Sequence, residues 1–312
     1  MKKLLAKMSF CGLLLFLFLL ALRTNEPLNA NTEDSANIHG LISVVEYNNN
    51  RIYLFGSMQF GRANWFPLNE VVEYAMSSSD KFLFEFDFSL VEIPEYAALI
   101  SGALIFDDDT TLEEYLPPDV FEMFKNTLSS YSTEYDYVSM VRPMWVSSIL
   151  NVIELGPILG LYPNNVIDIY IFEYATQNNK PVSGLIEFER EMYFMRASSE
   201  VQIDGIKYHF LDFDTSLQAL QELILAYESQ DADTIFEVIN AITAYDDAYA
   251  RYFTDILQTQ RSIEFADKIE TLLRETDEPT TFFATISIGH MVGDTYGNVL
   301  NILKDRGFQI TN

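Results

Sequence analysis

The residue best placed to do chemistry is His290, which follows an apolar stretch near the end of the sequence. That stretch, Phe282–Ile288, is too short for a typical helix and has the partly β-branched composition of a buried strand. Gly289 comes next, and a glycine gives the backbone room where a chain leaves a sheet. Because ligands of open α/β sheets usually lie beyond the strand ends, His290 is a candidate site residue. A structural histidine is the commoner alternative.

Two carboxylates form a second candidate group, because Glu85 and Asp87 lie one residue apart within another apolar stretch. That stretch, Lys81–Phe88, is expected to form a strand. Alternate side chains of a strand point to opposite faces, so both carboxylates are expected on one face and the phenylalanines on the other. The sequence leaves two alternatives open: a solvent-exposed acidic face, or carboxylates that line a cleft.

Other residues with metal or nucleophile chemistry are scarce. The acidic run Asp107–Asp109 precedes two threonines, but its spacing is not that of a calcium loop, so a helix cap is expected. Cys11 is the only cysteine in the chain, and it lies within the expected leader. The mature chain therefore has no thiol nucleophile, disulfide or thiolate metal site.

The composition of this 312-residue chain is that of a globular protein with an acidic surface. Hydrophobic residues make up 49% of it, enough for a full core, and its formal net charge is -27. A surface with that charge repels nucleic acid and anionic membranes, so neither is expected as a partner.

Residues 1–30 have the features of a bacterial-type signal peptide. Lysines precede an apolar core at Phe10–Leu22, and Ala30 offers a small residue for cleavage. The core is shorter than the roughly 20 residues that a spanning helix needs. We therefore expect an exported protein, secreted or associated with the cell envelope, with no stable membrane span in the mature chain.

The remaining elements are expected to form a single domain over residues 31–312, with a helical layer at about 214–275. Asparagines at positions 48–50 favour a tight turn between two strands. Further strands are expected at Leu41–Tyr47, Arg51–Phe55, Lys180–Ile186 and Phe308–Thr311, and helices at Leu68–Met76, Phe121–Tyr131, Met140–Gly156, Val166–Thr176 and Tyr296–Asp305.

Several segments between about Leu41 and Ile310 stand out by their order and spacing: YLFGSMQFG, FLFEFD, TTLEEYLPPDVF, VRPMW, VIDIYIFEYATQNNKPVSGL, FFATISIGHMVG and NVLNILKDRGFQI. Together they resemble the TraB/GumN family, whose members include the Tiki metalloproteases. The resemblance implies an α/β (α+β) fold in which helices flank a mixed β-sheet, with a largely helical insert before the last strands.

The resemblance also implies an active centre of two Gly-x-x-His motifs and a glutamate, which bind a divalent metal such as manganese, cobalt or zinc. Carried over by position, the glutamate is Glu85 and the second histidine is His290. Arg261 matches a family arginine in the last long helix. The first histidine position holds Gln59 instead.

Two further positions depart from the family pattern. Ser287 stands where the second motif has its glycine. Ile186 stands where the family tends to have a glutamate after the Gly184-Leu185 pair, and Glu187 is the residue expected to take that role.

Gln59 weakens the implied metal site. A glutamine amide is a weaker, neutral oxygen donor than an imidazole nitrogen, especially for zinc. Glu85 and His290 alone are usually too few ligands for tight binding.

Two hypotheses follow for the function. The first is a metal-dependent, peptidase-like hydrolase in which Glu85 and His290 bind the metal and Arg261 and Gln59 support catalysis. The second is a catalytically silent relative that binds a peptide or a small-molecule ligand in the same cleft. A structural protein of the cell envelope is a third alternative.

We expect cleavage of the leader to leave a mature N-terminus at or near Asn31, because a small residue and a polar stretch follow the apolar core. Mass spectrometry of the protein from the culture medium and the envelope fraction measures this directly. Recovery of a chain that still begins with Met1 would instead indicate an uncleaved anchor.

Overall fold

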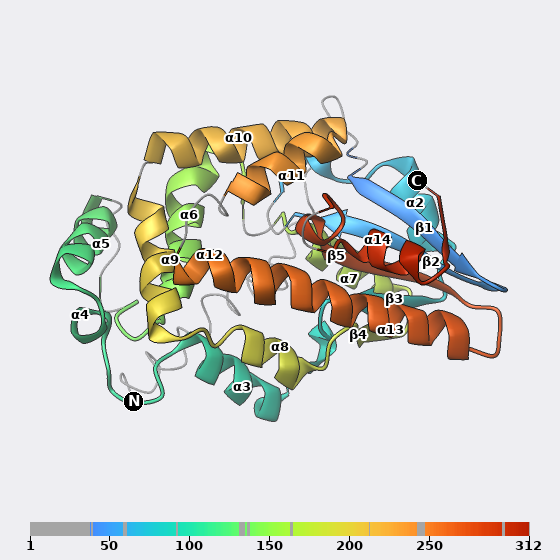
Figure 1. Cartoon of the computed structure of the whole chain (residues 1–312), viewed down its shortest axis with the longest axis horizontal. Coiled ribbons are helices and arrows are strands. Elements are labelled where there is room, and N and C mark those ends of the chain that lie inside the picture. Colours follow the sequence, from blue (N-terminus) through green and yellow to red (C-terminus); the bar gives the residue numbers. More distant parts are fainter. Residues whose placement is uncertain are drawn as a thin grey trace.

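The computed structural model describes most of the chain between Ile38 and Thr311 (Figure 1). The expected leader, residues 1–30, and the predicted site residue Gln59 lie outside the described residues. No helix in the described part of the chain is long and apolar enough to cross a membrane. The described ranges are 38, 40–58, 61–91, 93–130, 135, 138–162, 165–211, 213–241, 247–294 and 297–311.

The strands of these ranges form one mixed sheet with the order β4-β3-β5-β2-β1-β6. β2, β5, β3 and β4 are parallel neighbours, whereas β1 runs antiparallel to both β2 and β6. This confirms the expected mixed sheet. The strands are β1 Leu41–Tyr47, β2 Asn50–Ser57, β3 Lys81–Phe84, β4 Val182–Gly184, β5 Thr281–Ser287 and β6 Gln309–Thr311.

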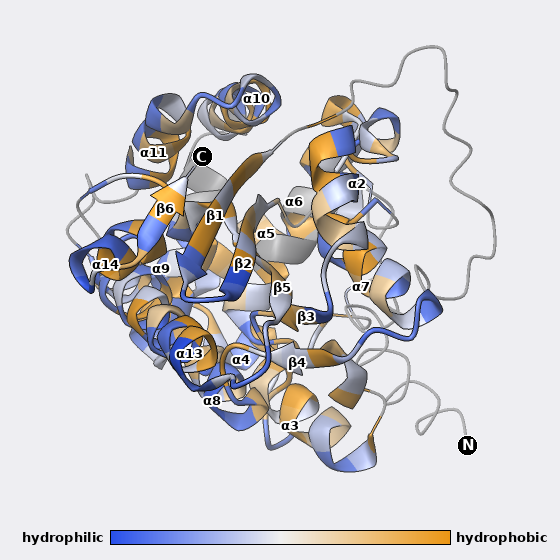
Figure 2. Cartoon of the chain, turned by 90° about the vertical axis from the view of Figure 1, so that its right-hand side faces the viewer, coloured by the Kyte–Doolittle hydropathy of each residue, from blue (hydrophilic) through white to orange (hydrophobic). Residues whose placement is uncertain are grey.

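Helices cover both faces of the sheet, as Figure 2 shows with α13 and α14 on one side and α2 and α7 on the other. They are α2 Glu70–Ser77, α3 Pro94–Leu104, α4 Leu112–Tyr115, α5 Pro118–Ser130, α6 Pro143–Leu159, α7 Ile167–Gln177, α8 Phe188–Phe194, α9 Ser199–Leu211, α10 Phe213–Ser229, α11 Ala232–Asn240, α12 Ala248–Tyr252, α13 Arg261–Glu275 and α14 Val299–Asp305.

Alternate side chains of the central strands pack into two cores on opposite faces. Phe55 of β2 and Phe283 of β5 pack with α2 and α7, whereas Leu54 and Ala284 pack with α13 and α14. Both sets are apolar because these strands are covered on both faces, which is why their sequences are almost continuously hydrophobic. The same alternation decides which face a polar side chain reaches at the strand ends.

Several elements agree with the sequence-based predictions. β1 and β2 form the expected hairpin, and Asn48 in its turn has a positive φ of 52°. Thr111 and Glu114 form a capping box at the start of α4, as expected of a cap after the acidic run. In the described part of 214–275, α10 to α13 and a π-helix at Phe253–Gln260 make up the expected helical layer.

Strand β3 is shorter than predicted and ends at Phe84, before Glu85. The Asp87 carboxylate accepts hydrogen bonds from the backbone N–H and the hydroxyl of Ser89, and so caps a 3-10 turn at Phe88–Leu90. Local bonds of this kind compete with strand pairing. The expectation that Glu85 and Asp87 share one strand face was therefore wrong, and Glu85 is the first residue beyond the strand.

Phe283 is expected to be a major source of core stability, because its ring is fully buried in the central strand β5. Its centroid lies 6.1 Å from that of Phe55 and 5.6 Å from that of Phe82. Phe283→Ala should lower the free energy of unfolding by about 3–5 kcal/mol in urea titrations. The control is Tyr74→Ala, since Tyr74 is 67% exposed; equal effects of the two changes would contradict this packing.

Candidate functional site

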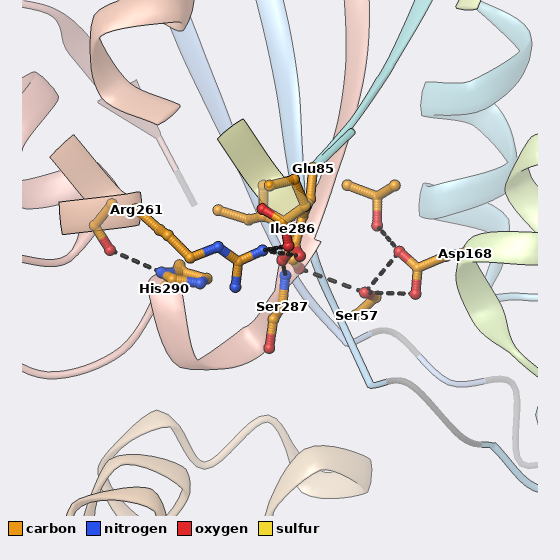
Figure 3. A network of polar contacts seen from close by, with 10 residues as sticks. Ser57, Glu85, Asp168, Arg261, Ile286, Ser287 and His290 are labelled. Carbon is orange, nitrogen blue, oxygen red and sulfur yellow. Dashed lines mark hydrogen bonds and ion pairs between the residues drawn. The ribbon is translucent and has the colours of Figure 1, made fainter. Parts of the chain in front are cut away.

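The carboxyl ends of the parallel strands bring polar residues together at one edge of the sheet. Ser57 ends β2 and is the register partner of Ser287, which ends the neighbouring strand β5. Glu85 follows the end of β3 on the other side of β5. Figure 3 shows Glu85, Arg261 and His290 grouped on one side of these strand ends and Asp168 on the other.

Glu85 is held in place by two hydrogen bonds to its carboxylate. Oε1 accepts from the backbone N–H of Ser287 at 2.7 Å, and Oε2 accepts from Nη2 of Arg261 at 2.6 Å. The Glu85 side chain keeps 20% of its surface exposed. Burial raises the pKa of this carboxyl, but the charge of Arg261, the nearby His290 and the Ser287 amide outweigh burial, so its pKa is lowered overall.

Arg261 also binds a second carboxylate. The same nitrogen, Nη2, donates to Oε1 of Glu191 at 2.8 Å. Glu191 comes from α8 and is fully buried. Burial raises the pKa of Glu191 to about 7, which Arg261 opposes and the charge of Glu85 reinforces. The first residue of α13 therefore ties α8 to the segment that leaves β3.

His290 lies in a 3-10 turn after β5 and is enclosed, with 1% of its surface exposed. Its Nδ1 lies 2.8 Å from the hydroxyl of Ser262, and the nearby backbone of Gln258 acts to raise the pKa of the ring. The ring of Phe265 packs edge-on at 5.0 Å. Burial lowers the pKa of His290 to about 3, and repulsion from Arg261 adds to this, so the imidazole is neutral at physiological pH.

The π-helix that precedes Arg261 supplies the Gln258 contact to His290. It runs directly into α13, so Gln258, Arg261 and Ser262 belong to one continuous helical segment. The Gln258 side chain packs against Gly289, where an added Cβ would lie 3.2 Å from its amide. Wide helical turns of this kind often occur at functional sites.

On the opposite face of the sheet, Asp168 of α7 forms a separate polar group. Its carboxylate accepts hydrogen bonds from the hydroxyls of Ser57 and Thr285, each at 2.9 Å. Burial raises the pKa of Asp168 to about 6, and the charge of Glu85 contributes to the rise. The two carboxylates are therefore close enough to influence each other across the strand ends.

The structure thus brings together three of the residues singled out in the sequence: Glu85, Arg261 and His290. Gln59 lies outside the described residues. Glu191, rather than Glu187, reaches Arg261, whereas Glu187 is exposed at the start of α8.

Sequence reasoning missed Asp168 and Glu191 as members of the site. Asp168 is an acidic residue in the first turn of a helix, where its charge is favourable without any site. Glu191 follows two other glutamates in a mixed-charge segment, so only its burial distinguishes it.

The described residues alone do not supply a ligand set for a divalent metal. Within the described ranges, no group of three or more His, Cys, Asp or Glu residues could hold a metal ion. Each oxygen of Glu85 already accepts an N–H bond, and one of these comes from the cation Arg261. His290 uses Nδ1 in its hydrogen bond with Ser262. The positive charge of Arg261 beside Glu85 also opposes the binding of a metal cation to this carboxylate.

Comparison with known families agrees with this arrangement of segments, because the model of the TraB/PrgY/gumN family matches residues 41–312. The chain belongs to the TraB/PrgY/gumN family. A search of curated proteins finds no match. The match confirms the resemblance inferred from the sequence. The site described above is the arrangement of polar residues at the strand ends in this member of the family.

In this TraB/PrgY/gumN-family chain, the stability should depend on pH through Asp168. Its pKa is about 6 in the folded chain against an ordinary value of 3.8, so between these values the folded state binds more protons than the unfolded state. The resulting stabilisation is fully present below about pH 4 and is lost as the pH rises through about 6. Relative to Asp168→Asn, the free energy of unfolding of the wild type should fall by up to about 1.4 kcal/mol per pH unit in that window.

Urea unfolding at several pH values from 3.5 to about 7 measures this difference. The matched control is Asp233→Asn, because Asp233 occupies the first turn of α11 as Asp168 does that of α7, but is exposed. A difference for Asp168→Asn that stays constant over the window would contradict the assignment.

Proposed function

We propose that this protein is an exported, catalytically silent member of the TraB/PrgY/gumN family that binds a peptide or another small N–H-bearing ligand at the carboxyl edge of the sheet. The observation that carries the proposal is the hydrogen bond between Arg261 and Glu85. It places a cation on the carboxylate that the family resemblance assigns to a metal. The positive charge of a guanidinium bonded to this carboxylate opposes the binding of a metal cation there.

The exposed part of Glu85 supports ligand binding at this position. A carboxylate has about four lone-pair sites, and the described hydrogen bonds of Glu85 use one on each oxygen. The partly exposed side chain can therefore still accept a bond from a ligand. An ammonium or amide N–H group fits best, because Asp168 lies nearby and adds negative potential.

A metal-dependent, peptidase-like hydrolase is the other candidate, and it rests on the family resemblance at Glu85, Arg261 and His290. The two candidates differ in what happens when an imidazole replaces Gln59. If the missing histidine is the only defect, Gln59→His completes a three-residue ligand set. If the Glu85 carboxylate and the His290 imidazole are already held by other partners, Gln59→His does not complete a ligand set.

Calorimetric titration with manganese, cobalt and zinc should therefore find no stoichiometric site in the wild type or in Gln59→His. Neither protein should hydrolyse casein with these metals added. Stoichiometric binding in the wild type that is lost in His290→Ala would overturn the proposal in favour of the hydrolase. So would a site gained in Gln59→His whose affinity falls below about pH 6.5, because imidazole binds metal only when neutral.

Thermal unfolding with a panel of tripeptides tests the binding half of the proposal. A peptide that binds the folded state raises the Tm by mass action. We expect such a shift in the wild type for at least one peptide with a free amino group, and its loss in Glu85→Gln. The control Glu70→Gln removes a charge from the exposed first turn of α2 and should keep the shift. An equal shift in Glu85→Gln, or none with any peptide at millimolar concentration, would contradict the proposal.

A further inference from the structure

We propose that Glu191 is a further residue of this site, where it positions Arg261 against Glu85. Two carboxylates share the single positive charge of Arg261, and Glu191 carries the proton that makes this cluster neutral. The inference concerns the chain's own proton and holds whichever ligand binds. Its test therefore needs no ligand, and its outcome is independent of the outcome for the proposed function.

The sharing is unusually direct, because a single nitrogen serves both carboxylates. Nη2 of Arg261 lies 2.6 Å from Oε2 of Glu85 and 2.8 Å from Oε1 of Glu191. The Glu191 side chain is 0% exposed and that of Arg261 is 10% exposed. Two carboxylates and one guanidinium carry one net negative charge, which is costly to bury without a further partner. A single added proton makes the cluster neutral.

The hydrogen bonds indicate where that proton lies. Both oxygens of Glu85 accept N–H bonds, one of them from a cation, and both bonds favour the ionised form of Glu85. Glu191 accepts through Oε1, whereas its Oε2 is buried and has no hydrogen-bond partner among the described residues. Nε of Arg261 is also buried and unpaired within those residues. Oε2 of Glu191 is thus the atom that can take the proton without displacing a bond.

The charged and titratable groups around Glu191 come from three directions. α13 contributes Arg261 and Glu264, the segment after β3 contributes Glu85, and α12 contributes Tyr252. Burial raises the pKa of Tyr252 to about 12, so its hydroxyl stays neutral near pH 7. Arg261 favours the ionised form of Glu191, whereas Glu85 and Glu264 favour its protonation, the charge of Glu264 being partly offset by its ion pair with Arg190. The raised pKa of Glu191 agrees with this balance.

A second ion pair between the same two helices provides a matched control. Arg190, the neighbour of Glu191 on α8, binds Glu264, which lies one turn after Arg261 on α13. Their charges are reversed relative to the first pair. The Arg190 and Glu264 side chains are 37% and 27% exposed. Glu264→Gln therefore removes a carboxylate that joins α8 to α13 without changing either carboxylate bound to Arg261.

The test compares the unfolding equilibria of wild type, Glu191→Gln and Glu264→Gln in urea between pH 5 and about 8. Glutamine mimics the protonated carboxyl but cannot titrate. If Glu191 is protonated in the folded chain, the unfolding constant of the wild type should rise relative to Glu191→Gln as the pH rises towards about 7, by up to tenfold per pH unit. Relative to Glu264→Gln, it should show no such rise.

A pH-independent ratio for Glu191→Gln would overturn the proposal, because a purely structural link between helices loses the same stability at every pH. A rise of the same size in the unfolding constant of the wild type relative to Glu264→Gln would also overturn the proposal. If Glu191→Gln does not fold, carbon-13 NMR of the glutamate side-chain carboxyls in the wild type decides the question. Titration of the Glu191 carboxyl near pH 7 supports the proposal, and titration near its ordinary value of 4.5 overturns it.

Discussion

The polar edge of this protein depends on the burial of one guanidinium. Arg261 is nearly enclosed, and its charge is tolerated because Glu85 and Glu191 both bind it. These residues come from α13, the exit of β3 and the buried side of α8, which are far apart in the sequence. Removing Glu85 leaves the charge of Arg261 buried without compensation, a change that typically costs about 3–5 kcal/mol. The contact therefore fixes how three separate segments meet beyond the sheet.

The central strand β5 separates two different electrostatic environments. On the side of α13, the N–H groups of Arg261 and Ser287 stabilise the ionised form of Glu85. On the side of α7, Asp168 accepts hydrogen bonds from the hydroxyls of Ser57 and Thr285, which compensate burial less well than a cation does. The pKa of Glu85 is accordingly lowered and that of Asp168 raised. Two carboxylates near the same strand ends thus have pKa values shifted in opposite directions because of their partners.

The sequence predicts local patterns here better than it predicts contacts between segments. The β1–β2 hairpin, the strand before His290 and the α4 cap could be predicted, because turn residues, apolar runs and capping residues act over a few positions. The early end of β3 was missed, since it depends on the short bond between Asp87 and Ser89. The role of Glu191 could not be seen at all. It depends on how α8 packs against α13, and nearby glutamates of the same segment look alike in sequence.

The agreement with the family at Glu85, Arg261 and His290 has a physical basis that does not require metal chemistry. Glu85 is needed to compensate Arg261. His290 fills an enclosed space between Ser262, Gln258 and Phe265, and its uncharged ring suits a position beside a guanidinium. Each residue therefore stabilises the others whether or not an ion binds. For this reason the identity of these residues is by itself weak support for hydrolysis.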